Sequence, residues 1–169
     1  AALAYNMGVG LENVRQGLRT FDTTFFQAPG RMNIFDEHSF KVILDYAHNA
    51  AAVKAMCDLV DRFEVRGRRI AVLAAPGDRR DEDIRDVART AAGHFDHYIC
   101  RRDDNPRGRG DDEVPNLLRA ALIGEGVDPE AVQIVIGEED ATEAALQLAQ
   151  ADDLVLVLIS GGGSALLSL

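Results

Sequence analysis

From residue 40 onward, short apolar runs rich in β-branched residues alternate with segments in which apolar residues recur every three or four positions. The short runs are typical of strands buried on both faces, and the spacing of three and four is typical of amphipathic helices. Strands that alternate with helices of this length predict a parallel sheet with right-handed crossovers. The expected strands are residues 40–44, 69–75, 97–100, 132–136 and 154–159, and the expected helices are residues 50–63, 81–95, 114–123 and 138–149.

A further strand is expected at residues 31–35, in which Met32 and Ile34 occupy alternate positions. The polar link 36–39 separates this strand from the next, and so short a link allows only an antiparallel pair. The predicted fold class is therefore α/β: a doubly wound, mostly parallel sheet of about six strands with one antiparallel strand and helices on both faces.

The N-terminal part of the chain differs from the rest. Residues 1–20 are predicted to be helical with a break at residues 8–10, and Pro29-Gly30 is the strongest turn signal before residue 70. The chain begins without a methionine or the basic start of a signal peptide, so we expect it to be part of a longer polypeptide. We expect residues 1–28 to be the last helix and linker of a preceding domain, and residues 29–169 to form the α/β domain.

Charge and cysteine usage limit the classes of partner. The net charge of −10 argues against general nucleic-acid binding, which needs a basic surface to displace counterions. No apolar run approaches the roughly 18 residues of a membrane span, so no membrane segment is expected. Cys57 and Cys100 lack metal-ligand spacing and are interpreted as buried free thiols, which fit a reducing, cytoplasmic location.

The loops after parallel strands share one edge of the sheet, and ligands of open α/β sheets bind at that edge. The loop after residue 75 contains Asp78 and Arg79, and the loop after residue 100 contains Arg107, each among charges of both signs. Such loops suit a small ligand that carries both charges, for example an amino acid or a nucleotide with Mg²⁺. For the acidic residues 81–83 the alternative is that they complement the N-terminus of a helix.

Asp45, His48 and Asn49 cluster in the turn after the strand at residues 40–44. They are candidates for acid–base chemistry or ligand binding, and the alternative is a self-capping turn in which Asp or Asn accepts helix amide hydrogens. The sequence offers no serine or cysteine nucleophile in a suitable setting, so a hydrolase triad is not predicted. The other histidines show no metal-ligand spacing with His48, so no metal site is predicted. The Gly-rich residues 160–164 could cradle an anion, but no Gly-Lys-Ser/Thr phosphate loop occurs.

Two motifs together carry a family resemblance. Pro29-Gly30-Arg31 followed by Asp45-Tyr46-Ala47-His48-Asn49 resembles the start of the C-terminal domain of Mur ligases and folylpolyglutamate synthetases. Residues 74–83 look more narrowly like the Mur-ligase-like part of cyanophycin synthetases. The sequence departs from the pattern at Ala50, where the family usually has Pro, and in its Gly-rich tail, which is similar to a segment of glycerate kinases.

The resemblance implies an ATP-dependent, ADP-forming acid–amino-acid ligase that makes an acyl phosphate, which an incoming amine then attacks. In that family the residues matching Arg31 and Asp45 contact the nucleotide, and those matching His48 and Asn49 lie beside it. Residues 104–107 match the Asp-Asn-Pro-Arg motif with which one Mur ligase branch holds its amino acid. A cyanophycin synthetase would join arginine to poly-aspartate. The amino-acid site expected here comprises Asp104, Asn105 and Arg107, with Asp78 and Arg79 from the neighbouring loop.

In such ligases the phosphate-binding loop and most contacts to Mg²⁺ belong to a central ATPase domain, of which residues 1–28 would be the end. We therefore expect this chain alone to be inactive and to bind ATP weakly. Its expected partners are ATP, an amino-acid substrate and the rest of its own polypeptide. The alternative is a non-catalytic nucleotide-binding or interaction domain of α/β fold. A third interpretation, a small kinase or hydrolase, would require this chain alone to form a phosphorylated or hydrolysed product.

Overall fold

The computed structural model describes residues 1–22, 24 and 27–159. The strands are β1 (Asn33–Phe35), β2 (Lys41–Asp45), β3 (Arg69–Leu73), β4 (His97–Cys100), β5 (Val132–Ile134) and β6 (Leu154–Leu158). The helices are α1 (Ala2–Asn6), α2 (Leu11–Thr20), α3 (Ala50–Val60), α4 (Asp81–Ala91), α5 (Glu113–Gly124) and α6 (Glu138–Leu148). A 3-10 turn, Pro129–Ala131, precedes β5.

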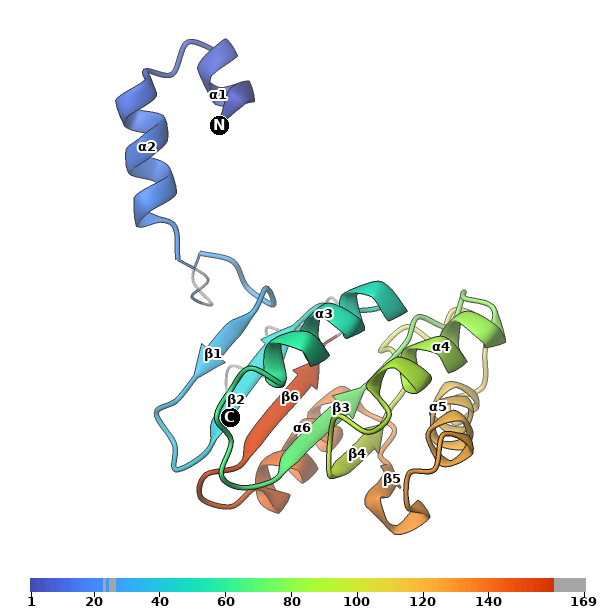
Figure 1. Ribbon diagram of the computed structural model, residues 1–169. Coiled ribbons are helices and arrows are strands. Elements are labelled where there is room, and N and C mark those ends of the chain that lie inside the picture. The colour runs from blue at the N-terminus through green and yellow to red at the C-terminus, as the bar shows by residue number, and fades with distance from the viewer. Residues whose placement is uncertain (23, 25–26, 160–169) are drawn as a thin grey trace.

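The strands form one six-stranded sheet in the order β1-β2-β6-β3-β4-β5 (Figure 1). β1 pairs with β2 in the antiparallel direction, and the other neighbouring strands run parallel. β6 returns to the middle of the sheet, between β2 and β3, so the last described strand has neighbours on both sides. The predicted α/β sheet, mostly parallel with one antiparallel strand and helices on both faces, is confirmed.

The two faces of the sheet have separate apolar cores. Ala71 and Leu73 of β3 belong to the core under α3, α4 and α5, and Ile70 and Val72 belong to the core under α6. Figure 1 shows α3, α4 and α5 on the near face of the sheet and α6 behind it. Because successive strand residues alternate between two covered faces, these strands have the continuous apolar sequences that identified them.

α4 ends at Ala91, before the predicted residue 95, and the contacts of Tyr98 explain the difference. The Tyr98 hydroxyl accepts hydrogen bonds from the amides of Gly93 and Phe95 and donates one to the carbonyl of Ala91. The Phe95 ring packs edge-to-face on the Tyr98 ring at 5.9 Å. The apolar spacing thus continues to Phe95 because that side chain joins the core, although the helix has already ended.

α1 and α2 form an arm that lies apart from the sheet and its covering helices (Figure 1). Neither helix contains a buried residue, and the apolar side chains of Leu3, Met7 and Leu18 are exposed. The predicted break separates the two helices, and Gly8 adopts a φ of +87° there. An exposed apolar surface of this kind is typical of a segment that packs against a partner.

Candidate functional site

The loops that follow β2, β3 and β4 lie at one edge of the sheet because these strands are parallel. Asp45 ends β2, and His48 and Asn49 lie in the loop that follows it. Asp78 and Arg79 lie in the loop after β3, and residues 104–107 lie in the loop after β4. Arg31 precedes β1, and the antiparallel register pairs Asn33 with Leu44, so Arg31 reaches the same edge. The Gly-rich segment at residues 160–164, the remaining candidate loop, lies outside the described residues.

A tight turn holds the start of β1 against Asp45. The amide of Met32 donates a 2.9 Å hydrogen bond to Oδ2 of Asp45, and the amide of Gly30 donates one of 2.7 Å to Oδ1 of Asn33. Gly30 has a φ of +70°, and a Cβ at this position would lie 2.7 Å from Cδ1 of Ile159. The positive φ therefore favours glycine in the Pro-Gly-Arg motif, whereas the Ile159 methyl group ends a flexible side chain that could move aside.

Arg31, Asp45 and Tyr46 form the first cluster of the site. Burial raises the pKa of Asp45 above its ordinary value, and the Met32 amide and the Arg31 charge oppose this shift. The guanidinium carbon of Arg31 lies 5.0 Å from the centre of the Tyr46 ring, which is a cation–π distance. The structure thus gathers a half-buried carboxylate, a guanidinium and an aromatic ring at the carboxyl end of β2.

His48 and Asn49 have different local roles. Oδ1 of Asn49 accepts a 2.9 Å hydrogen bond from the Ala52 amide, so Asn49 is the N-cap of α3. For Asn49 the self-capping turn, given above as the alternative to a ligand-binding role, is therefore present. Nδ1 of His48 lies 3.0 Å from the carbonyl oxygen of Tyr46. A neutral imidazole that donates from Nδ1 to this carbonyl presents Nε2 as an acceptor.

Asp78 and Arg107 form the second cluster, which joins the loops after β3 and β4. Nη1 of Arg107 lies 2.9 Å from Oδ2 of Asp78, and this hydrogen bond holds the pKa of Asp78 below its ordinary value. Arg107 adopts a φ of +52°, and its amide donates to Oδ1 of Asn105 at 3.0 Å. Asp104 is exposed, and its carbonyl accepts a hydrogen bond from Arg102. The Asp-Asn-Pro-Arg motif is therefore a turn that presents Arg107 to Asp78.

Two hollows adjoin these clusters. A cavity of about 410 Å³ lies between the N-terminal ends of α3 and α4, and its lining includes His48, Asn49 and Arg79. Tyr46 and Asp103 line a narrower cleft together with Pro76 and His48. Side chains from three different strand-end loops therefore face shared space at this edge of the sheet.

A buried ion pair beneath the loops escaped the sequence analysis. Arg101 follows β4 directly and is 0% exposed, and Glu138 begins α6 and is 6% exposed. The two side chains pair, and the Arg101 guanidinium also donates to the carbonyl of Leu158 at 2.8 Å. Burial lowers the pKa of Arg101, and the Glu138 carboxylate opposes this shift. The pair ties the ends of β4 and β6 to the start of α6, and its only sequence signal was an Arg next to an apolar strand.

The cysteines do not contribute a nucleophile. Cys57 and Cys100 are free and buried as predicted, and burial raises the pKa of each thiol to about 12. Within the described ranges, no three His, Cys, Asp or Glu side chains are grouped so that they could hold a metal ion. The described helices also include none that is long and apolar enough to cross a membrane.

Comparison with known proteins gives matches along most of the chain. Its sequence is 39% identical over 159 residues to the cyanophycin synthetase of Trichormus variabilis and 37% identical over 154 residues to that of Geminocystis herdmanii. These alignments cover 92% and 91% of this chain and 17% of either relative. The solved structure of E. coli FolC in complex with DHPP and ADP matches 95% of this chain and 34% of its own, with a TM-score of 0.70 and 26% identity.

The family assignment follows from the matched residues. Residues 30–161 match the family model described as Mur ligase, glutamate ligase domain. The match begins at the glycine of the Pro-Gly-Arg motif and includes all six strands of the sheet. It confirms the resemblance seen in the sequence motifs, and the chain belongs to the Mur ligase family through its glutamate ligase domain.

Proposed function

We propose that this chain is the C-terminal lobe of an ATP-dependent, ADP-forming ligase that joins a carboxylate to an amino acid. The observation that carries the proposal is the presence, at one sheet edge, of two clusters with different chemistry: Arg31, Asp45 and Tyr46 in one, and Asp78 and Arg107 in the other. Because the chain is similar to cyanophycin synthetases, we propose the substrates that the sequence resemblance implies, with arginine as the incoming amino acid and poly-aspartate as the acceptor.

The first cluster suits the nucleoside end of ATP. The Met32 amide uses one lone pair of the Asp45 carboxylate, so further lone pairs remain for ribose hydroxyl donors. In a half-buried position such hydrogen bonds are stronger than in water. The Arg31 guanidinium provides donors for a phosphate, and His48 and Asn49 line the adjacent cavity. The similar solved structure of E. coli FolC contains ADP, which supports nucleotide binding by this family.

The second cluster suits an α-amino acid. Arg107 can bind the α-carboxylate through its planar fork, and Asp78 can accept from an ammonium or guanidinium group. Asn105 binds the Arg107 amide, and we assign Asp104 and Arg79, the chain neighbours of this pair, to the proposed amino-acid site as well. Because Asp78 and Arg107 already bind each other, the ligand would replace one ion pair with two, one at each end of the molecule.

In the proposed reaction a carboxylate oxygen of the acceptor attacks the γ-phosphorus of ATP, and ADP leaves with the bridging oxygen. The amine of the amino acid then attacks the acyl carbon, phosphate leaves with the electron pair of the C–O bond, and the amine nitrogen loses a proton. This chain binds and orients nucleotide and amino acid, which lowers the entropic cost of bringing them together. We assign Mg²⁺ mainly to the central domain of the full-length polypeptide, as the family resemblance of the sequence motifs implies.

The chain by itself is expected to bind ATP weakly, with a Kd of about 1 mM or higher. Arg31 and Asp45 contact only one side of a nucleotide, and the exposed arm of α1 and α2 would pack against the domain that supplies the other side. Isothermal titration of the 169-residue chain with ATP and Mg²⁺ measures this affinity. A Kd in the low micromolar range would contradict the proposed division of the site.

Substitution of Asp45 by Asn in the full-length polypeptide is expected to raise the KM for ATP by about tenfold, because an amide is a weaker acceptor for ribose hydroxyls than a carboxylate. Asn keeps an oxygen for the Met32 amide, so the turn before β1 should persist. The rate of ADP release, measured in the presence of acceptor primer, gives the KM for ATP and the KM for the amino acid when each is varied in turn. An unchanged KM for ATP would remove Asp45 from the nucleotide site.

The alternative function is a non-catalytic nucleotide-binding or interaction domain, which the family fold alone would also allow. The same ADP-release assay separates the two. Release that depends on both the primer and one amino acid supports the ligase, and nucleotide binding without ADP release from the full-length polypeptide supports the alternative.

A further inference from the structure

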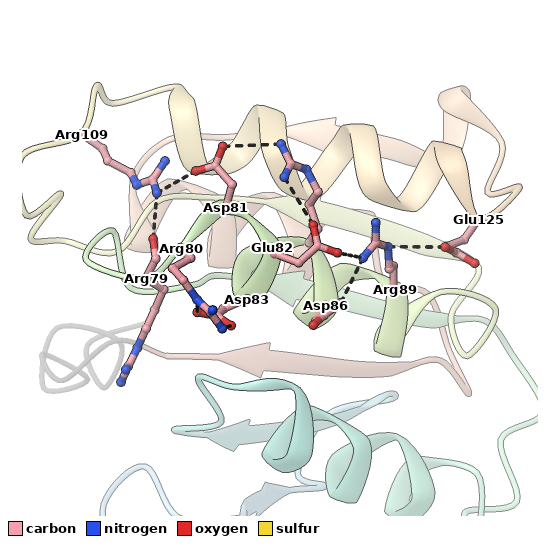
Figure 2. A network of polar contacts seen from close by, with 10 residues as sticks. Arg79, Arg80, Asp81, Glu82, Asp83, Asp86, Arg89, Arg109 and Glu125 are labelled. Carbon is pink, nitrogen blue, oxygen red and sulfur yellow. Dashed lines mark hydrogen bonds and ion pairs between the residues drawn. The ribbon is translucent and has the colours of Figure 1, made fainter.

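Arg109 makes a set of contacts that the proposed function does not use. Its Nε donates to the carbonyl of Gly77 and its Nη2 donates to the carbonyl of Arg79, each at 2.7 Å. Its guanidinium also pairs with Asp81 at 2.8 Å and with Glu113 at the start of α5. Figure 2 shows Arg109 between Arg79 and Asp81, and its side chain is 17% exposed. One guanidinium therefore joins the loop after β3 to the loop after β4.

The two carbonyls that Arg109 binds flank Asp78 in the sequence. A guanidinium is planar and its N–H groups have fixed directions, so bonds to both carbonyls restrain the 77–78 and 79–80 peptide units, between which the backbone of Asp78 and Arg79 runs. This restraint sets the direction in which the Asp78 carboxylate leaves the loop. Asp78 itself is exposed, and packing alone would leave this side chain free to change direction.

The same residue restrains Arg107. The amide of Arg109 donates to the carbonyl of Pro106 at 3.1 Å and closes the turn in which Arg107 has its positive φ. Gly77 packs directly on that turn, because a Cβ on Gly77 would lie 2.2 Å from the Pro106 carbonyl oxygen. The two loops thus meet through backbone atoms, and Arg109 fastens them on both sides of the Asp78–Arg107 pair.

We propose that Arg109 is a positioning residue for the amino-acid site, which holds the backbones of the two loops in place so that the side chains of Asp78 and Arg107 face the two charged groups of the incoming amino acid. This inference rests on the proposed function of that pair. Arg109 does not touch the substrate in this scheme. Its effect comes from geometry, since a displacement of about 1 Å at a binding group costs up to about 100-fold in rate.

The test compares Arg109→Met and Arg109→Lys in the full-length polypeptide. Met keeps much of the side-chain length and removes every donor, and Lys keeps the charge but cannot bridge two carbonyls and two carboxylates with one planar group. Both variants are expected to raise the KM for the amino acid by about tenfold and to leave the KM for ATP unchanged. Hydrogen exchange of the amides at residues 77–81 and 105–110 is expected to become faster in both.

Arg89→Met is the matched control. Arg89 lies on the same helix as Asp81 and pairs with Glu82, Asp86 and Glu125 (Figure 2), so its loss also removes several ion pairs but touches neither loop. This control should change neither KM value nor the exchange of the two loops.

The outcomes separate the inference from the proposed function. Unchanged exchange in Arg109→Met, full rescue by Arg109→Lys, or equal changes in both KM values would overturn the positioning role. If the unsubstituted protein released no ADP with any amino acid, the proposed function would fail. The exchange measurement would then still decide whether Arg109 holds the loops, with faster exchange supporting that role and unchanged exchange refuting it.

Discussion

Substitution of Arg101 by Met is expected to lower the free energy of unfolding of the chain by about 3–5 kcal/mol, the usual cost of removing one partner of a buried ion pair. The Glu138 carboxylate would keep its buried position without the arginine, and the Leu158 carbonyl would lose a donor at the end of β6. Urea denaturation followed by circular dichroism measures the change, provided that the slope of the transition stays constant.

A double variant, Arg101→Met with Glu138→Leu, distinguishes the buried charge from general packing. Replacement of both charges by apolar groups is expected to recover most of the lost stability, because the desolvation of both ions is then avoided. Arg89→Met serves as the surface control and should have a small effect, since its partners are about half exposed. A double variant that is no more stable than Arg101→Met alone would show that the ion pair is not the source of the loss.

The fold could be predicted from the sequence because its strands are covered on both faces and its helices on one. Ile70 to Leu73 are apolar at every position, whereas Ile84, Val87, Ala88 and Ala91 recur at helical spacing, and the structure buries all of them. The ends of elements were less predictable. Apolar spacing continues past the end of α4 through Phe95, since the core accepts side chains from a turn as readily as from a helix.

The candidate site could be predicted in part. Sequence motifs identified Arg31, Asp45, Asp78 and Arg107, and the structure brings Arg31 near Asp45 and Asp78 onto Arg107. The residues that hold these groups in place were missed. They act through backbone carbonyls far away in the sequence, as Arg109 does at Gly77, and such contacts leave no pattern in residue type or spacing.

Substitution of Arg107 by Ala in the full-length polypeptide is expected to raise the KM for the amino acid by about 10- to 100-fold, the range for loss of a charge-assisted pair with a carboxylate. The KM for ATP should stay within about twofold, because Arg31 and Asp45 belong to the other cluster. ADP release with primer and with each candidate amino acid in turn measures both values.

The pattern of loss after Arg107→Ala identifies what Arg107 recognises. An equal loss with every amino acid assigns Arg107 to the α-carboxylate, which all of them share, and a loss with one amino acid assigns it to that side chain. Arg80→Ala is the control, since Arg80 lies in the same edge of the sheet but is 84% exposed and pairs with Asp83 on the surface of α4. If the KM for ATP rose instead and the KM for the amino acid did not, Arg107 would belong to the nucleotide site, and the division of this edge into two clusters would be wrong.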